Sequence, residues 1–412
     1  MRTPAGGVEQ VDPERDPGLG TVERTRFGGL LYEPTTFVLV LLVAVHVFVA
    51  GLAVARLSSD PVTDDDVLRF HGIAQQDGMP WRDFEVEYAP LEALAILLLG
   101  GSTAGATGVA TVMVALGADL ATAWMLAVGW GRGASARYLL VGLPLLTFIF
   151  LRLDAIPVAL TVLGLLLIRR GRSSWGGGAL AAAVLTKVWP AVILPGLAFG
   201  RGRRALGWAL GVLLAGLTLW LVIGGPDAPA QVASFRGADG WSVESTVGSV
   251  VWTVTREPPV LEAGAPRVGT VPDAARIVLG LGALITIAAV WFRARRFPGD
   301  LAGAPSMVAV AALLAWSPLF SLQYALWLTP FLAIAASERA VRPGASLAAA
   351  AVVGTGVVRA VAASTTTVAI EQALLLARNA TVIAIVVWWF ARRSASRAGS
   401  TAPEATVGPD AA

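Results

Sequence analysis

Apolar residues dominate the chain from Thr36 to Phe390, in stretches of about 20 residues separated by short polar or charged segments. A helix of about 20 residues spans roughly 30 Å of hydrocarbon at about 1.5 Å per residue. The pattern therefore predicts an all-α polytopic integral membrane protein. We expect single crossings at residues 36–56, 103–130, 205–223, 274–292, 343–362 and 371–391.

Three further apolar stretches, residues 138–168, 175–200 and 303–337, begin and end beside arginines. Each must leave and return to the same side, with about 15 residues per limb, which is short for a full span. These stretches predict re-entrant-like hairpins and bring the total to about twelve crossings. Residues 89–100 are also too short for an ordinary span, and either lie in the interface or re-enter.

Clusters of arginine set the expected orientation, because basic residues are enriched in cytoplasmic loops. The clusters are Arg132 with Arg137, residues 169–172, 201–204 and 293–296, Arg339 with Arg342, and Arg392 with Arg393. Placing them inside the cell predicts a multi-pass protein of the cell (plasma) membrane with both termini cytoplasmic. One transmembrane domain, residues 36–391, then has external loops at 57–88 and 225–272, while 1–35 and 392–412 form disordered cytoplasmic tails.

Composition narrows the possible functions. The chain of 412 residues is 56% hydrophobic and 14% charged. Its net charge of +3 does not indicate a nucleic-acid partner, because the arginines fall in the clusters that set topology rather than along one face. The absence of cysteine excludes thiol nucleophiles and cysteine metal sites. No glycine-rich phosphate loop follows a predicted strand, so a nucleotide-binding domain is not expected.

A few polar residues interrupt the apolar background at positions that the predicted topology places on the outer side of the membrane. They are Asp64, Asp65 and Asp66, Arg152 with Asp154, Lys187, and Gln323 with Tyr324. Charge at membrane depth is tolerated where protein or water covers it. These residues therefore predict a shared, water-accessible cavity, which we interpret as an active site.

Lys187 is the only lysine in the sequence. The other 30 of its 31 lysine and arginine residues are arginine. A buried ammonium group needs an anionic partner. That partner is either a ligand such as a lipid phosphate or the carboxylate of Asp154 in a structural salt bridge. Arg152 and Asp154 are likewise open to interpretation as a local pair, and Gln323 and Tyr324 as helix-capping residues.

The first external loop is rich in acidic and aromatic residues, as sugar-binding surfaces are. Its candidate sugar-binding residues are His71, Trp81, Glu87 and Tyr88. Carboxylates accept hydrogen bonds from sugar hydroxyls and can remove a proton from an attacking hydroxyl. The acids at 64–66 also suit the start of a helix. For His71 the pattern favours an ordinary exposed loop histidine over a catalytic one. We expect His46, inside the first span, to be a hydrogen-bonded helix residue.

Four motifs in order carry a family resemblance. They are Asp66-Val-Leu-Arg-Phe70 with Gly78-Met-Pro-Trp81-Arg-Asp83 and Glu87-Tyr88-Ala-Pro90-Leu91, then Arg152-Leu-Asp154, then Thr186-Lys187-Val-Trp189-Pro190, and then Ser317-Pro318-Leu-Phe320-Ser-Leu-Gln323-Tyr324 followed by Trp327 and Pro330. Together they resemble bacterial polyprenyl-phosphate-mannose-dependent mannosyltransferases, glycosyltransferase family 87 of the GT-C superfamily. The resemblance covers about residues 36–390. The family often has tyrosine where Phe70 and Trp189 stand here.

The resemblance implies a GT-C fold with an extracytoplasmic active site. It implies transfer of a sugar, expected to be mannose, from a polyprenyl-phosphate donor to a hydroxyl of a glycolipid or glycan acceptor, with inversion and without cofactor or metal. Asp66 is then the general base, with Asp65 the fallback, and Lys187 with Arg152 stabilises the donor phosphate. Residues implied to bind substrate are His71, Trp81, Glu87, Tyr88, Asp154, Gln323 and Tyr324.

A transporter or flippase of a lipid-linked or anionic substrate is the alternative function, since charged residues in broken helices are also a transporter feature. No second copy of the acidic loop or of the Lys187 turn occurs in the other half of the sequence, as an internally repeated transporter would have. A noncatalytic membrane scaffold leaves the buried lysine unexplained.

Overall fold

The computed structural model describes residues 34–59, 62, 64–199, 202–233, 238–296, 300–364 and 367–392. The predicted tails therefore lie outside the described residues, apart from Pro34, Thr35 and Arg392.

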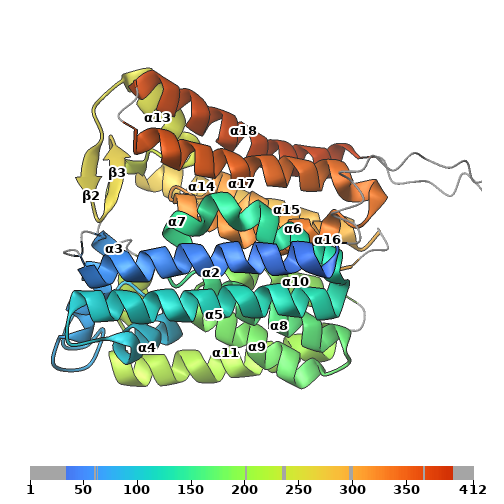
Figure 1. Ribbon diagram of the computed structural model, residues 1–412, viewed down its shortest axis with the longest axis horizontal. Helices are drawn as coiled ribbons and strands as arrows, with labels where there is room; N and C mark the ends of the chain where they lie inside the picture. Colours follow the sequence, from blue (N-terminus) through green and yellow to red (C-terminus); the bar gives the residue numbers. More distant parts are fainter. Residues whose placement is uncertain are drawn as a thin grey trace, which may run out of the picture.

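Six long apolar helices run roughly along the long axis of the molecule (Figure 1). They are α2 (Thr36–Ser59), α5 (Ala104–Trp130), α11 (Arg203–Gly224), α14 (Asp273–Ala294), α17 (Arg342–Ala362) and α18 (Val368–Ala391). Each coincides with a segment predicted to cross the membrane. Large apolar side chains on their outer faces are exposed, for example Leu214 on α11 and Ile285 on α14. Such faces are suited to lipid, and the chain is a multi-pass membrane protein.

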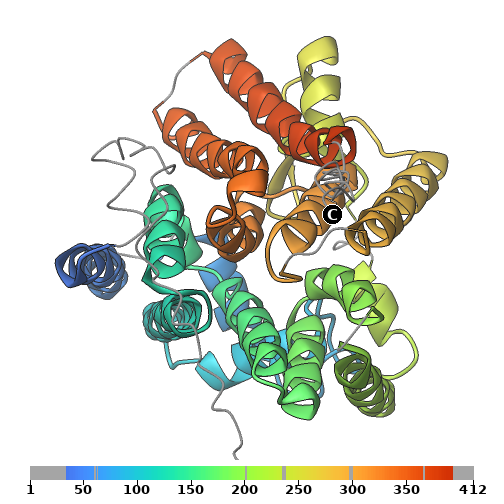
Figure 2. The ribbon, with the colours of Figure 1, turned by 90° about the vertical axis from the view of Figure 1, so that its right-hand side faces the viewer.

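Three pairs of shorter helices pack among the long ones, as the view along the axis shows (Figure 2). In the first, α6 (Arg132–Gly142), η1 (Leu143–Leu145) and α7 (Leu146–Ile149) are followed by α8 (Ala155–Arg169). In the second, α9 (Ser173–Thr186) is followed by η2 (Trp189–Ile193) and α10 (Leu194–Leu197). In the third, α15 (Ala304–Trp316) is followed by η5 (Leu322–Leu328) and α16 (Thr329–Ala335), and η6 (Arg339–Val341) then leads into α17. Each of the three predicted stretches contains shorter helices interrupted near the predicted polar residues, while their course as re-entrant-like hairpins and the count of twelve crossings stay predictions.

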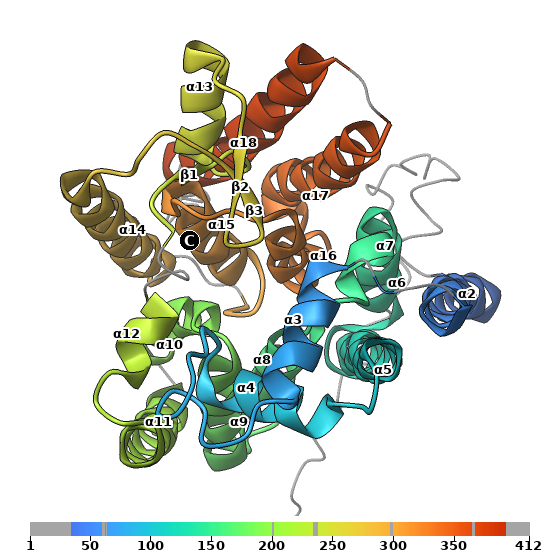
Figure 3. The same ribbon diagram turned by 90° about the vertical axis from the view of Figure 1, so that its left-hand side faces the viewer.

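A layer of loops, short helices and a small sheet covers one end of the bundle (Figure 3). Its helices are α3 (Asp65–Ala74), α4 (Pro90–Leu99), α12 (Ala228–Ala233) and α13 (Thr246–Thr255). Its strands, β1 (Trp241–Ser242), β2 (Val260–Glu262) and β3 (Ala265–Val268), pair antiparallel in the order β1-β3-β2. The layer is formed by the two predicted external loops and residues 89–99. The sheet was not predicted from the sequence.

The first loop is fixed by local hydrogen bonds. The side chain of Asp64 caps α3, because its Oδ1 accepts from the backbone N–H groups of Asp66 and Val67 at 3.1 and 3.2 Å. The interpretation of the acidic run as a helix start is therefore correct for Asp64. Further along, Gln231 of α12 donates to the carbonyl of Trp81 at 2.8 Å and accepts from the N–H of Val86 at 3.1 Å. These two bonds hold the first loop against the second.

His46 lies in a buried polar network between α2, α5 and α6. Its Nδ1 is 2.6 Å from Oδ2 of Asp119, and its Nε2 is 3.1 Å from the carbonyl of Leu139. The hydroxyl of Tyr138 donates to the other carboxylate oxygen of Asp119 at 2.7 Å. The expectation that His46 is a hydrogen-bonded helix residue is confirmed, and the network holds three helices together.

Candidate active site

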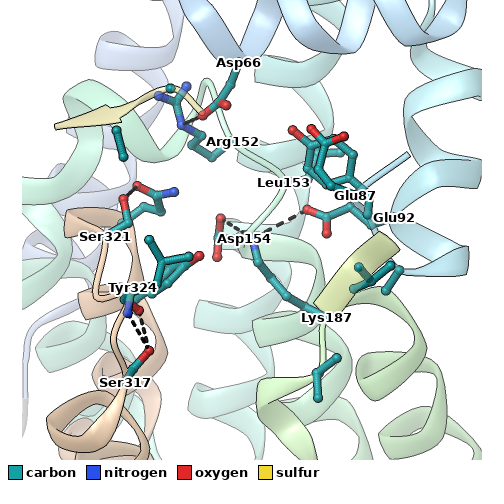
Figure 4. A pocket seen from close by; sticks show the side chains of 18 of the residues that line it. Asp66, Glu87, Glu92, Arg152, Leu153, Asp154, Lys187, Ser317, Ser321 and Tyr324 are labelled. Atoms are coloured by element: carbon teal, nitrogen blue, oxygen red, sulfur yellow. Dashed lines mark hydrogen bonds and ion pairs between the residues drawn. The ribbon is translucent and has the colours of Figure 1, made fainter. Parts of the chain in front are cut away.

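A polar cavity of about 350 Å³ lies between the end layer and the turns of the three helix pairs. Figure 4 shows its side chains, which converge from α3, α4 and all three turns. Its charged lining residues are Asp66, Glu87, Glu92, Arg152, Asp154, Lys187 and Arg267. Of the eight residues predicted from sequence to share one cavity, six line it, namely Asp66, Arg152, Asp154, Lys187, Gln323 and Tyr324, whereas Asp64 and Asp65 do not.

Asp66 and Asp64 hold the guanidinium of Arg152 between them. Nη1 of Arg152 donates to Oδ1 of Asp64 at 2.7 Å, and its Nε forms an ion pair with Asp66. Burial acts to lower the pKa of Arg152, but the charges of Asp66 and Asp64 oppose this, and the pKa is raised on balance. Arg152 is therefore a permanent cation that fixes the Asp66 carboxylate in the cavity wall. The local pair of Arg152 with Asp154 considered from sequence is replaced by this arrangement.

Lys187 follows α9 at the turn of the second helix pair, with two carboxylates around its ammonium group. Its Nζ is 2.9 Å from Oδ2 of Asp154 and 3.5 Å from Oε1 of Glu92. Asp154, which is 1% exposed, also accepts a hydrogen bond from Nε1 of Trp327 at 2.8 Å. The salt bridge to Asp154 considered from sequence is present, so the charge of Lys187 is balanced within the protein.

Glu92 is a site residue that sequence reasoning missed. It stands in the first turn of α4, is 4% exposed, and faces Lys187 across the cavity. Burial, partly offset by the charge of Lys187, raises the pKa of Glu92 to about 7. The sequence did contain a signal for Glu92, because this acidic residue interrupts an otherwise apolar segment. It was overlooked because residues 89–100 had no clear assignment and an acid is common at the start of a helix.

Aromatic rings form one wall of the cavity. Tyr324 stacks on Trp327 with ring centroids 4.1 Å apart, and Trp327 stacks on Trp189 at 5.2 Å. The ammonium of Lys187 lies 5.6 Å from the centroid of the Tyr324 ring. Beside this stack, Gln323 lines the cavity and accepts a hydrogen bond from Ser321 at 2.6 Å. The wall is thus both flat and polar, which suits a sugar ring.

The other predicted residues of the first loop divide into two groups. Glu87 and Tyr88 line the cavity, and Glu87 is bound in a bidentate manner by Arg69 at 3.0 and 2.7 Å. Asp65 is exposed and does not line it.

His71 and Trp81 also lie outside the lining. Nδ1 of His71 is 3.2 Å from the hydroxyl of Thr107. Trp81 is 8% exposed, packs edge-to-face on Trp220, and donates from Nε1 to the carbonyl of Tyr88. In this conformation both side chains support the loop.

Within the described residues, no group of three or more histidine, aspartate or glutamate side chains is arranged to hold a metal ion. Comparison with known proteins returned no matching protein-family model and no matching curated protein. The resemblance to family 87 mannosyltransferases therefore stays a prediction.

Proposed function

We propose that the protein is a membrane glycosyltransferase that moves a sugar, expected to be mannose, from a lipid-phosphate donor to a hydroxyl group of a glycolipid or glycan acceptor. The observation that carries this proposal is the carboxylate of Asp66, held by Arg152 in the wall of a cavity that also contains hydroxyl, amide and aromatic groups. Such a cavity offers hydrogen bonds and a flat ring face to a sugar, and a base to an acceptor. The cavity lies between the turns of the helix pairs and the end layer, which the arginine pattern predicts to be extracytoplasmic.

In the proposed reaction, Asp66 takes the proton of the acceptor hydroxyl as its oxygen attacks the anomeric carbon of the donor sugar. The bond from this carbon to the phosphate oxygen breaks in the same step, and the lipid phosphate leaves with the bonding electrons. A single displacement of this kind inverts the configuration at the anomeric carbon. Cations in the cavity wall stabilise the negative charge that accumulates on the departing phosphate.

The alternative function, a transporter or flippase, is also compatible with charged residues at helix breaks.

A direct test that separates the two functions is incubation of the purified protein with a panel of prenyl-phosphate sugars and a mannosylated glycolipid acceptor. We expect release of prenyl phosphate together with an extended acceptor. Movement of the intact lipid-linked sugar across proteoliposomes without cleavage would overturn the enzyme proposal and support the transporter.

A further inference from the structure

A second cavity, of about 400 Å³, adjoins the polar one. The two share lining residues, namely Arg267, Leu313, Ser317 and Leu319. The polar cavity is rich in charged side chains, whereas the second is largely apolar, with Leu279, Gly280 and Ala283 of α14 along one side. The two cavities therefore meet at these residues, and the surroundings change from polar to apolar near Arg267.

The apolar cavity belongs to the lipid-facing side of the molecule. Next to its lining residues on α14, Val278, Leu281 and Leu284 are exposed large apolar side chains. Trp316, which lines this cavity, packs its ring at Gly282, where an added Cβ would approach it to 2.6 Å, and its Nε1 donates to Thr286 at 3.0 Å. These contacts anchor Trp316 against α14.

Arg267 is held at the boundary by the sheet. It lies in the central strand β3, opposite Ser242 of β1 and Val260 of β2, and is 6% exposed. Its Nη1 donates to the carbonyl of Gly240 at 3.0 Å, and its Nε to the carbonyl of Glu262 at 3.2 Å. These bonds fix the plane of the guanidinium group at the junction of the two cavities.

Charge distribution favours this boundary for an anion. Lys187 and Arg152 each contact two carboxylates, so a phosphate bound there must lie among four acidic side chains. Near Arg267, the carboxylate of Glu262 accepts from the N–H groups of Asp239 and Gly240 at 2.8 and 3.1 Å and also attracts the guanidinium of Arg267. Arg276 of α14 adds a second guanidinium to the apolar cavity wall, with its Nη2 3.4 Å from Oδ1 of Asp239. Two acids thus accompany two arginines at this boundary, against four acids around Lys187 and Arg152. Arginine recognises phosphate through paired hydrogen bonds, so this end of the space suits a phosphate group.

We propose that Arg267 binds the phosphate of an isoprenoid lipid whose chain occupies the apolar cavity and whose sugar occupies the polar one. This inference rests on the proposed function, and it assigns the phosphate to Arg267 rather than to Lys187. The placement of the sugar, the phosphate and the prenyl chain follows from the polarity of the two cavities. A sugar needs the polar groups, a prenyl chain needs the apolar groove, and the phosphate that joins them falls at the boundary.

The test is binding of sugar-free prenyl phosphates to the purified full-length protein, by native mass spectrometry or fluorescence quenching. Arg267→Gln should weaken binding of both long-chain and two-isoprene phosphates by about tenfold to a hundredfold, since charge-assisted hydrogen bonds are lost. Gly280→Leu should weaken only the long-chain ligand, by about tenfold, because an added Cβ at Gly280 meets no atom within 4 Å and the larger side chain fills the groove.

Gly211→Leu on α11 is the matched control, because Gly211 also has no atom within 4 Å of an added Cβ and lines neither cavity. It should bind both ligands as the wild type does. Normal long-chain binding by both Arg267→Gln and Gly280→Leu would overturn the inference. So would displacement of prenyl phosphate by equal amounts of phosphatidylglycerol, which would mark a general site for anionic bilayer lipids.

The two proposals fail in different ways. Prenyl-phosphate binding that depends on Arg267 and Gly280 supports the lipid site even if no sugar transfer is detected. Sugar transfer by the wild type with full activity in both variants would overturn the lipid site and leave the glycosyltransferase proposal standing.

Discussion

Nζ of Lys187 lies 2.9 Å from Oδ2 of Asp154, so the single lysine of the chain is paired with a carboxylate from the turn of a different helix pair. The pair joins the ends of two short helices beneath the cavity. Because Glu92 approaches the same ammonium at 3.5 Å, Lys187 is the common counterion of two buried acids. Its first role in this conformation is therefore to hold the cavity floor together.

Replacing Lys187 by methionine tests this role. Lys187→Met leaves the buried carboxylate of Asp154 without its cation, and breaking such a pair costs about 3 to 5 kcal/mol. We expect a large fall in the thermal unfolding temperature of the purified protein in detergent. The double variant Lys187→Met/Asp154→Asn should recover part of the loss, because the uncompensated charge is gone.

Arg172→Met, which removes an exposed cation at the start of α9, is the control and should leave the unfolding temperature nearly unchanged. A Lys187→Met protein with wild-type stability but lost prenyl-phosphate binding would contradict the structural role. That result would instead favour Lys187 as the residue that binds the phosphate.

Glu92 predicts a dependence of stability on pH. Burial raises its pKa in the folded protein to about 7 from the ordinary value of 4.5, so the folded state holds this proton more tightly than the unfolded state does. The contribution of Glu92 to stability is then greatest below the unfolded pKa and falls as pH rises through about 7. We expect Glu92→Gln to remove this part of the slope, so that the wild type loses unfolding temperature relative to Glu92→Gln between about pH 5 and 7.5.

Thermal unfolding across this pH range checks the prediction, with Glu85→Gln as the control because Glu85 is exposed in the neighbouring loop. Parallel curves of unfolding temperature against pH for the wild type and Glu92→Gln would contradict the prediction, because they would show that Glu92 titrates alike in the folded and unfolded states.

Sidedness can be tested with introduced cysteines, because the chain has none of its own. Asp77→Cys and Glu257→Cys place thiols on exposed positions of the two loops of the end layer, and Arg172→Cys places one on an exposed turn between α8 and α9. From the distribution of arginine we expect an impermeant thiol reagent to label the first two in intact cells and the third after permeabilisation alone. The reverse pattern would put the cavity on the cytoplasmic side.

The sequence predicted the positions of the long helices well, because about 20 consecutive apolar residues leave few alternatives to a span. It also predicted that Asp154, Lys187 and Tyr324 share a cavity, since polar groups at the turns of short helix pairs need common cover. These predictions depend on the cost of burying polar groups in an apolar environment, which acts on each segment separately.

Features that depend on contacts between distant segments were not predictable in the same way. The strands β2 and β3 are short, and they are joined by a turn at Ala263 and Gly264 in which both residues have positive φ. Strand β1 comes from a separate segment and pairs with β3. The place of Arg267 in the central strand therefore could not be inferred from the sequence pattern. Trp81 looked like an exposed sugar platform, but its packing against Trp220 comes from a helix more than 100 residues away in the sequence.

The central claim is that Asp66 acts as the base in sugar transfer, and turnover by purified Asp66→Asn and Asp65→Asn with a prenyl-phosphate sugar and a glycolipid acceptor tests it most directly. Asp66 lines the cavity and Asp65 is exposed outside it, so the two neighbours form a matched pair. We expect Asp66→Asn to bind prenyl phosphate normally but to lose turnover by a factor of about 10² to 10⁴, the usual contribution of general base catalysis, and Asp65→Asn to turn over as the wild type does. Wild-type turnover by a folded Asp66→Asn protein would contradict the claim.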